Sequence, residues 1–87
     1  MKVKLHRIFI KHYYKRIFPD SNLDRQYKNR LELFLSGPKH PLLRDHKLIG
    51  DNRDRRAFWV TGDIRVVYKI VEGEILLYDI GTHNQVY

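Results

Sequence analysis

Two histidines, His46 and His83, are the candidates for proton transfer in this sequence. Histidine is the only side chain whose unperturbed pKa, about 6.5, lets it serve as either base or acid at neutral pH. A pair of such groups can take a proton from an attacking hydroxyl and give one to a leaving oxygen. The sequence leaves open which histidine has which role, and the alternative is that both are ordinary surface residues.

Asp63 and Arg65 stand two positions apart at the start of an expected strand, so their side chains should leave the same face of a sheet. The other face should belong to the core, since it carries Ile64, Val66, Tyr68 and Ile70. Arg65 is therefore expected on the face away from the core, where a guanidinium group could bind a phosphate. Asp63 could orient a histidine or pair with Arg65. The alternative is that Asp63 is only a turn residue and Arg65 only a surface cation.

Two aromatic residues, Tyr87 and Trp59, could stack on nucleic-acid bases, and Lys47 and Arg56 could add cations to the same site. The alternative for Arg56 is a solvated strand end. Tyr87 lies at the very end of the chain and has little core to join. Trp59 follows Phe58 in a strand, so one of these two must face away from the core. On the Arg65 face Trp59 would contact substrate; on the other face it would be a core residue.

The candidate site residues would be positioned by three runs rich in β-branched and aromatic residues, at 57–60, 64–71 and 75–80. Turn signals at Thr61-Gly62-Asp63 and Glu72-Gly73 separate the runs and predict a three-stranded antiparallel meander. The sheet would hold Arg65 and Trp59 in fixed positions. The polar segment from Gly81 to Tyr87 follows its last strand.

The N-terminal part predicts one strand and two helices. Residues 2–10 suit a first strand that runs toward a helix at 12–18, which Pro19 ends. A second helix begins after a cap at Asp20 or Ser21 and ends at Ser36-Gly37-Pro38. Its apolar stripe consists of Leu23, Tyr27, Leu31, Phe34 and Leu35. The fold class is therefore α+β, in the order β-α-α-β-β-β, with a helical hairpin on one face of an antiparallel sheet.

The segment from Gly37 to Asp54 is expected to be a long loop. Its Leu42, Leu43, Leu48 and Ile49 indicate that the loop is held against the core. His46 belongs to this anchored part.

A chain of 87 residues predicts one domain over residues 1–87. It has no cysteine, and no apolar run reaches the roughly 20 residues of a membrane span, so a cytoplasmic protein without membrane contact is expected. His6, His12 and His40 show no spacing typical of metal binding, so we expect neither a metal nor another cofactor.

Basic residues are concentrated in the first half of the chain. Residues 1–44 carry 11 Lys and Arg against 3 acids, whereas residues 45–87 carry 6 against 7. Such an asymmetry favours a polyanionic partner, with nucleic acid the leading class. The alternative is a solubilising surface, or one complementary to an acidic protein.

Several segments stand in an order that is specific when they are taken together: Asp45-His46-Lys47-Leu48-Ile49-Gly50, then Arg56, then Gly62-Asp63-Ile64-Arg65-Val66-Val67-Tyr68, then Gly81-Thr82-His83. In this pattern the chain resembles the YafQ branch of the RelE/ParE toxin superfamily. The resemblance implies a toxin of a type II toxin–antitoxin pair, which cleaves messenger RNA in the ribosomal A site.

Carried over position by position, the resemblance implies catalytic roles for His46, His83, Asp63 and Arg65, and a base contact for Tyr87. The chain departs from the pattern at three positions. Trp59 stands where the pattern has a second sheet histidine, Ile64 where it has tryptophan, and Asp79 where it has arginine.

The implied partners are a cognate antitoxin, ribosomal RNA and messenger RNA. We expect the antitoxin to be acidic and to cover the basic surface and the open sheet face. One rival function is inhibition of DNA gyrase in the manner of ParE, which the paired histidines argue against. Another is a decayed, non-catalytic toxin that acts as a binding module, which the three departures favour.

Overall fold

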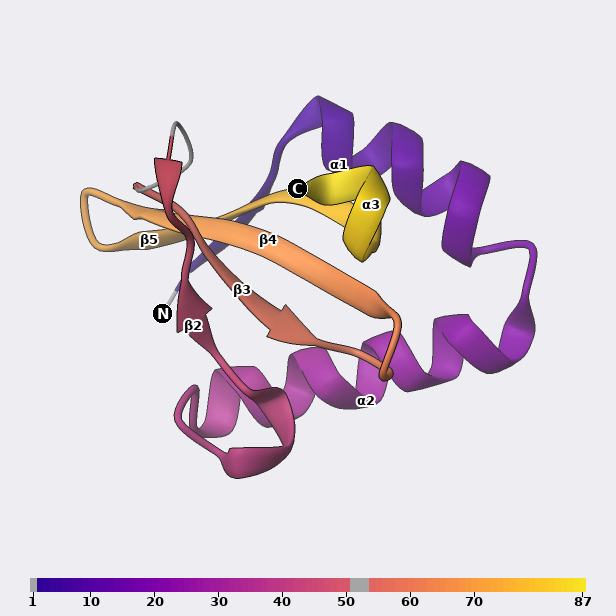
Figure 1. The fold of residues 1–87 in the computed structure, drawn as a ribbon, viewed down its shortest axis with the longest axis horizontal. Helices are drawn as coiled ribbons and strands as arrows, with labels where there is room; N and C mark the ends of the chain where they lie inside the picture. The colour runs from indigo at the N-terminus through magenta and orange to yellow at the C-terminus, as the bar shows by residue number, and fades with distance from the viewer. Residues whose placement is uncertain (1, 51–53) are drawn as a thin grey trace.

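The computed structural model describes residues 2–50 and 54–87 (Figure 1). Its elements follow in the order β1 (Val3–Leu5), α1 (Arg7–His12), the π-helical turn η1 (Tyr13–Ile17), α2 (Ser21–Ser36), the 3₁₀ turn η2 (Pro41–Leu43), β2 (His46–Lys47), β3 (Arg56–Trp59), β4 (Ile64–Val71), β5 (Glu74–Thr82) and α3 (His83–Val86). The predicted α+β class is confirmed, and so is the meander formed by β3, β4 and β5.

The sheet has five strands in the order β1-β5-β4-β3-β2. It differs in two ways from the predicted antiparallel sheet. β1 pairs in parallel with β5, with Val3 opposite Ile75, so the sheet is mixed and not purely antiparallel. The expected loop after α2 contains β2, which pairs antiparallel with β3 and places His46 opposite Ala57.

The first helix begins earlier than expected. β1 ends at Leu5, and His6 caps α1 through Nδ1, which accepts the Ile8 N–H at 3.1 Å. The predicted strand over residues 2–10 is therefore wrong beyond Leu5. The helical path continues through η1, where the Phe18 N–H donates to the Tyr13 carbonyl at 2.9 Å.

α2 matches the prediction closely. The Asp20 carboxylate accepts the N–H groups of Asn22 and Leu23 at 3.0 and 3.2 Å, which satisfies donors of the first turn. Tyr27 and Phe34 are buried, but Leu35 is 48% exposed, so its place in the buried stripe was wrong. Leu35 follows Phe34, which packs on the sheet, and one residue along a helix turns the side chain by about 100°, away from the sheet.

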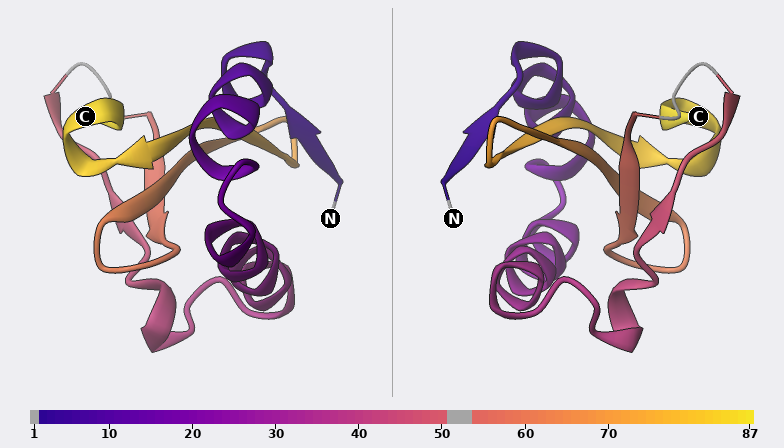
Figure 2. Two further views of the ribbon diagram at one scale, coloured as in Figure 1. Left: turned by 90° about the vertical axis from the view of Figure 1, so that its right-hand side faces the viewer. Right: turned by 90° about the vertical axis from the view of Figure 1, so that its left-hand side faces the viewer.

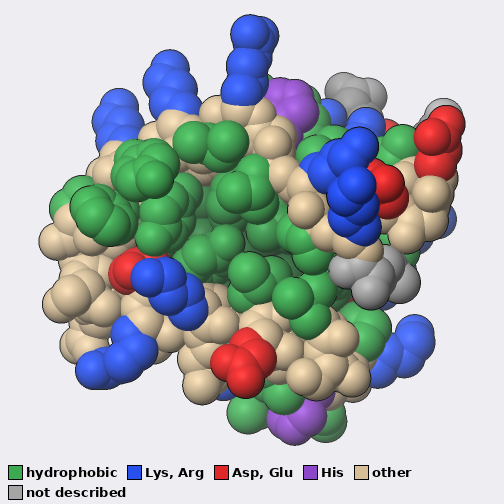
Figure 3. Space-filling view, turned by 180° about the vertical axis from the view of Figure 1, so that it is seen from behind, with side chains coloured by type: hydrophobic (Ala, Val, Ile, Leu, Met, Phe, Trp, Pro, Cys, Tyr) green, Lys and Arg blue, Asp and Glu red, His purple; other side chains and the backbone are tan. Residues whose placement is uncertain are grey.

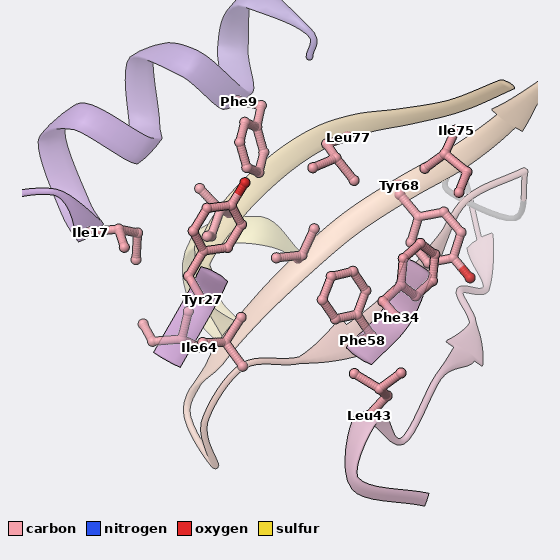
Figure 4. Close-up of a cluster of buried hydrophobic side chains, with 13 residues drawn as sticks. Phe9, Ile17, Tyr27, Phe34, Leu43, Phe58, Ile64, Tyr68, Ile75 and Leu77 are labelled. Carbon is pink, nitrogen blue, oxygen red and sulfur yellow. The ribbon is translucent and has the colours of Figure 1, made fainter. Parts of the chain in front are cut away.

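The main core lies between the sheet and the helices α1 and α2 (Figure 4). Phe34 stacks on Phe58 with ring centroids 4.6 Å apart, and Ile64, Val66 and Tyr68 come from β4 as their alternation predicted. Ile70, at the end of the same strand, is 58% exposed and contradicts that pattern. Burial of large apolar side chains on this face is the main source of stability.

A smaller apolar cluster covers the opposite face of the sheet. Leu48, Ala57 and Val67 form it, with Tyr78 and with Val86 of α3 packed against them. α2 and α3 therefore lie on opposite faces of the sheet (Figure 2). None of the described helices has the length and apolar character needed to cross a membrane.

Candidate functional site

His46 is held in place by its neighbour Asp45. The Asp45 carboxylate accepts a hydrogen bond from Arg56 Nε at 2.7 Å and another from the Tyr68 hydroxyl. Hydrogen bonding to Asp45 raises the pKa of Arg56, and burial together with the same carboxylate raises the pKa of Tyr68. Both donors therefore stay protonated at neutral pH, so Asp45 ties the start of β2 to β3 and β4.

The His46 ring has a defined orientation. Its Nδ1 lies 2.9 Å from the carbonyl oxygen of Arg44, which can only accept a hydrogen bond, so Nδ1 carries the proton. Its Nε2 lies 3.3 Å from the Tyr87 hydroxyl. In the neutral ring Nε2 therefore carries the lone pair, which faces the hydroxyl of the C-terminal Tyr87.

His83 and Tyr87 are placed by α3, which the sequence analysis did not predict. The helix begins with a capping box, in which Gln85 Oε1 accepts the Thr82 N–H at 2.8 Å. The spacing of Thr82 and Gln85 is a readable signal for such a helix start. One turn of helix brings the rings of His83 and Tyr87 edge to face, with centroids 4.5 Å apart.

Together these segments form a groove of about 350 Å³, here called the histidine groove, which is lined by His46, Lys47, Leu48, Ile49, His83 and Tyr87. The structure thus brings together His46, His83 and Tyr87. Lys47 borders the groove, but it follows His46 in β2, so its side chain leaves the strand on the other side. Leu48 and Ile49, expected only to hold the loop against the core, also line the groove.

Arg65 lies beside this groove on the face away from α2, as strand parity predicted. It is only 8% exposed, and its Nη1 donates to the carbonyl oxygens of Thr61 at 3.2 Å and Gly62 at 2.9 Å. Burial raises the pKa of Tyr87, and the Arg65 cation, which also forms a hydrogen bond to Tyr87, acts against that rise. Arg65, which was expected to be exposed, is therefore buried, and Tyr87 is its neighbour on the side of the histidine groove.

Trp59 lies opposite Arg65 in the sheet, on the same face. The guanidinium carbons of Arg65 and Arg44 lie 4.0 and 4.5 Å from the centroid of its ring. Stacking of a base on Trp59 would compete with these cation–π contacts. Arg44, an exposed residue that the sequence analysis did not select, thus contacts Trp59 with its side chain and His46 with its carbonyl group.

Two predicted site residues lie apart from the histidine groove. Asp63 is exposed in the turn before β4, and among the described residues its carboxylate has no hydrogen bond or ion pair. Arg56 shares the core face with Phe58, because the two are two positions apart in β3, and there it pairs with Asp45. The geometry gives Arg56 a structural role.

A comparison with protein families decides the identity of the chain. The sequence profile of one family, described as "Bacterial toxin of type II toxin-antitoxin system, YafQ", matches residues 1–87. The chain belongs to the YafQ toxin family. No curated protein sequence matches the chain significantly.

Solved structures of bacterial toxins have a similar fold. A toxin from Helicobacter pylori, crystallised as a copper-bound mutant, is 26% identical with a TM-score of 0.81, over 100% of this chain and 99% of that one. YafQ from E. coli is 21% identical with a TM-score of 0.75, over 99% of this chain and 97% of that one. In the E. coli DinJ–YafQ complex, the matched chain is 22% identical with a TM-score of 0.69, over 99% of this chain and 97% of that one.

The three positions at which the chain departs from the YafQ pattern each have a clear environment. Ile64 is part of the main core, and Trp59 carries the two guanidinium contacts. Asp79 accepts from His12 Nδ1 at 2.6 Å and lies 3.6 Å from Arg16 Nη1, so its carboxylate is paired with α1 and η1. Among the described residues, no group of three His, Asp or Glu side chains is placed to hold a metal ion.

Proposed function

We propose that this YafQ-family toxin is a ribosome-dependent endoribonuclease that cleaves messenger RNA without a metal ion or another cofactor. The observation that supports this most is the convergence of His46, Tyr87 and His83 on one groove from segments far apart in the sequence. A protein that acts by binding alone does not require two histidines in contact with one tyrosine. The arrangement offers two proton-transfer groups to one substrate.

The reaction is an intramolecular transfer at phosphorus. A base removes the proton of the 2′-OH, and the 2′ oxygen then attacks the adjacent phosphorus. The bond from phosphorus to the 5′ oxygen breaks, and an acid gives this leaving oxygen a proton. The products are a 2′,3′-cyclic phosphate and a 5′-OH, and no water is consumed in this step.

The hydrogen bonds of His46 favour it as the base. Because the Arg44 carbonyl holds the proton on Nδ1, Nε2 carries the lone pair, and it can accept the proton of the 2′-OH when this group takes the place of the Tyr87 hydroxyl. His83 then takes the role of the acid. The Tyr87 hydroxyl, which contacts His46 and the Arg65 guanidinium, is placed to bind the substrate between the two histidines.

The charge distribution supports the proposed partners. The net charge of +8 in residues 1–44 favours docking on ribosomal RNA, and binding should weaken steeply with added salt. Arg65 and the exposed Arg44 supply positive charge beside the histidine groove for the phosphate. A cognate antitoxin would keep the toxin inactive, and an activity on translating ribosomes would take place in the cytoplasm.

The first experiment is mapping of messenger RNA ends in a reconstituted translation system with the purified toxin. We expect cuts at fixed codon positions that appear only when ribosomes occupy the message, and 5′-OH ends at the cuts. Intact messages together with inhibited DNA gyrase would overturn the proposal and support the ParE-like alternative. Intact messages with active gyrase would indicate a non-catalytic binding protein.

Gly81 provides a test of how α3 positions the groove. A Cβ at this buried position would lie 2.6 Å from Arg16 Nη1 and 2.7 Å from Gln85 Oε1. Both atoms are already engaged, Arg16 with the Ile80 carbonyl and Gln85 with the Thr82 N–H. We expect Gly81→Ala to disturb the cap of α3 and to lower the free energy of unfolding by about 1 kcal/mol.

Cleavage by Gly81→Ala should fall about tenfold or more, because misplacement by ~1 Å can slow catalysis strongly and α3 carries His83 and Tyr87. Urea unfolding and end mapping measure the two effects. Gly62→Ala is the control, since a Cβ there would meet nothing within 4 Å. Equal cleavage by the two variants would show that the cap does not position the groove.

A further inference from the structure

Basic side chains surround the ring of Tyr78, on the same face of the sheet as α3. Tyr78 packs there against the smaller apolar cluster. The guanidinium carbon of Arg55 lies 3.7 Å from the centroid of the Tyr78 ring, and Lys69 Nζ lies 6.0 Å from it. The His6 ring lies 4.5 Å from the Tyr78 ring, centroid to centroid. Segments far apart in the sequence thus meet in one group, here called the Tyr78 cluster, which consists of His6, Arg55, Lys69 and Tyr78.

Two members of the Tyr78 cluster carry hydrogen-bond donors that no acceptor in residues 2–50 and 54–87 engages. One donor is the Tyr78 hydroxyl. The other is His6 Nε2, which carries the proton of the neutral ring because His6 Nδ1 accepts the Ile8 N–H. Both residues are partly exposed, so a ligand can approach them from solvent. Donors that stand beside two cations fit an anion with several acceptor oxygens.

The carboxylate of Asp54 marks the position that such an anion would take. One of its oxygens lies 3.9 Å from Arg55 Nε, and the other lies 3.9 Å from Lys69 Nζ. Both distances are too long for hydrogen bonds, and the Asp54 side chain is 62% exposed, so the two ion pairs are weak. The two cations therefore converge on one anionic group. A phosphate, which has more acceptor oxygens, can displace the exposed carboxylate.

The Tyr78 cluster lies within reach of an RNA strand that leaves the histidine groove. Lys69 follows Arg65 by four positions in β4, so the two side chains leave the same face of the sheet about 13 Å apart. A few nucleotides of an extended strand span that distance. Figure 3 shows the side of the molecule turned away from α3 and β2, where apolar side chains fill the middle and the Lys and Arg side chains stand around them. A polyanion meets closer cations along β4 than across that apolar surface.

We propose that the Tyr78 cluster binds a backbone phosphate of the message outside the nucleotides that are cut, with Arg55 and Lys69 as its cations and the Tyr78 hydroxyl as a further donor. The identity of the strand rests on the proposed function, but the binding step is independent of the nuclease chemistry. In this arrangement the histidine groove holds the reacting group, and the Tyr78 cluster holds the strand. Because such contacts go to the backbone and not to base edges, RNA of any sequence should bind.

The test measures the affinity of the full-length toxin for a fluorescent single-stranded RNA whose 2′-OH groups are methylated, so that it cannot be cut. Lys69→Gln removes one phosphate contact, and counterion release then predicts about fivefold weaker binding at about 0.1 M salt and a salt slope smaller by ~0.7. Tyr78→Phe keeps the ring beside Arg55 and removes only the hydroxyl. It should weaken binding about twofold to tenfold and leave the salt slope unchanged.

Asp54→Asn gives the opposite result, because it removes the carboxylate that competes with the phosphate. Binding should become about twofold tighter or more. Glu32→Gln is the matched control, since it makes the same change in net charge at an exposed carboxylate of α2, and its affinity should equal that of the wild type. Circular dichroism checks the folding of each variant, and Asp54→Asn, at an exposed side chain, tests the inference even if Lys69→Gln does not fold.

The inference would be overturned if the wild-type toxin did not bind the RNA, or if Lys69→Gln kept the wild-type affinity and salt slope. Equal affinities of Asp54→Asn and Glu32→Gln would also overturn it. If Lys69→Gln weakened binding to the purified antitoxin or to empty ribosomes and left RNA affinity unchanged, the cluster would serve a protein or ribosomal RNA instead. A wild-type toxin that binds the RNA as expected but cuts no message would count against the nuclease proposal alone.

Discussion

His83→Ala is expected to slow messenger RNA cleavage by ~10²- to 10⁴-fold, because the leaving 5′ oxygen would depart without a proton donor. This corresponds to about 3 to 5 kcal/mol of lost transition-state stabilisation. His83 is exposed, so its loss should leave the fold intact. Single-turnover cleavage on ribosomes programmed with a synthetic message measures the effect.

Cleavage by His46→Ala is expected to be slowed to a similar extent, because the 2′-OH would lose its base. A modified substrate distinguishes the loss of the base from the loss of the acid. When sulfur replaces the bridging 5′ oxygen at the cut site, the leaving group is a thiolate, which departs without an acid. This substrate should restore most of the activity of His83→Ala and little of the activity of His46→Ala.

His40→Ala is the matched control, since His40 is also exposed but does not line the histidine groove. It should cleave both substrates like the wild type. Rescue of His46→Ala in place of His83→Ala would reverse the two roles. If neither variant were slowed, the histidine groove would not be the site of cleavage.

The sequence predicted the parts of the fold that depend on local patterns. The stripe containing Tyr27 and Phe34 identified α2, and the turn signals with their alternating strands identified the meander. Parity also placed Arg65 on the face away from α2. The spacing of apolar residues and the turn signals between neighbouring strands are local, so α2, the meander and the face of Arg65 could be predicted without knowledge of distant residues.

The missing parts depend on partners far away in the sequence. β2 has only two residues, too few for any periodicity, and it exists because β3 offers it an edge. The burial of Arg65 depends partly on the adjacent turn, whose Thr61 and Gly62 carbonyls accept from it, and partly on Tyr87 at the end of the chain, which only the folded structure brings close. No local pattern indicates that Asp45 pairs with both Arg56 and Tyr68, because these partners lie 11 and 23 positions away.

Some errors could have been avoided. Arg56 is two positions before Phe58, so the parity argument that was applied to Arg65 would have placed it on the core face. Thr82 and Gln85 have the spacing of a capping box, which predicts the short helix α3. Both signals are local, and both determine which residues reach the histidine groove.

Asp45→Ala is expected to lower the free energy of unfolding by about 2 to 3 kcal/mol, mainly because it leaves the buried Tyr68 hydroxyl without an acceptor. The Arg56 side chain is 38% exposed and can reach water, so its lost ion pair should add little. Cleavage should also fall, since β2 would lose the anchor that precedes His46. Asp63→Ala, at an exposed carboxylate without such contacts, should change stability by less than ~0.5 kcal/mol.

A double-mutant cycle shows whether the Tyr68 hydroxyl is the cause. Tyr68→Phe removes the donor, and combining it with Asp45→Ala removes both partners, which costs less than leaving one of them unpaired. The double variant should therefore be more stable than Asp45→Ala alone in urea unfolding, but it should remain slow in cleavage because β2 is still unanchored. Full recovery of cleavage in the double variant would show that Asp45 acts on His46 through the buried hydroxyl and not through the attachment of β2.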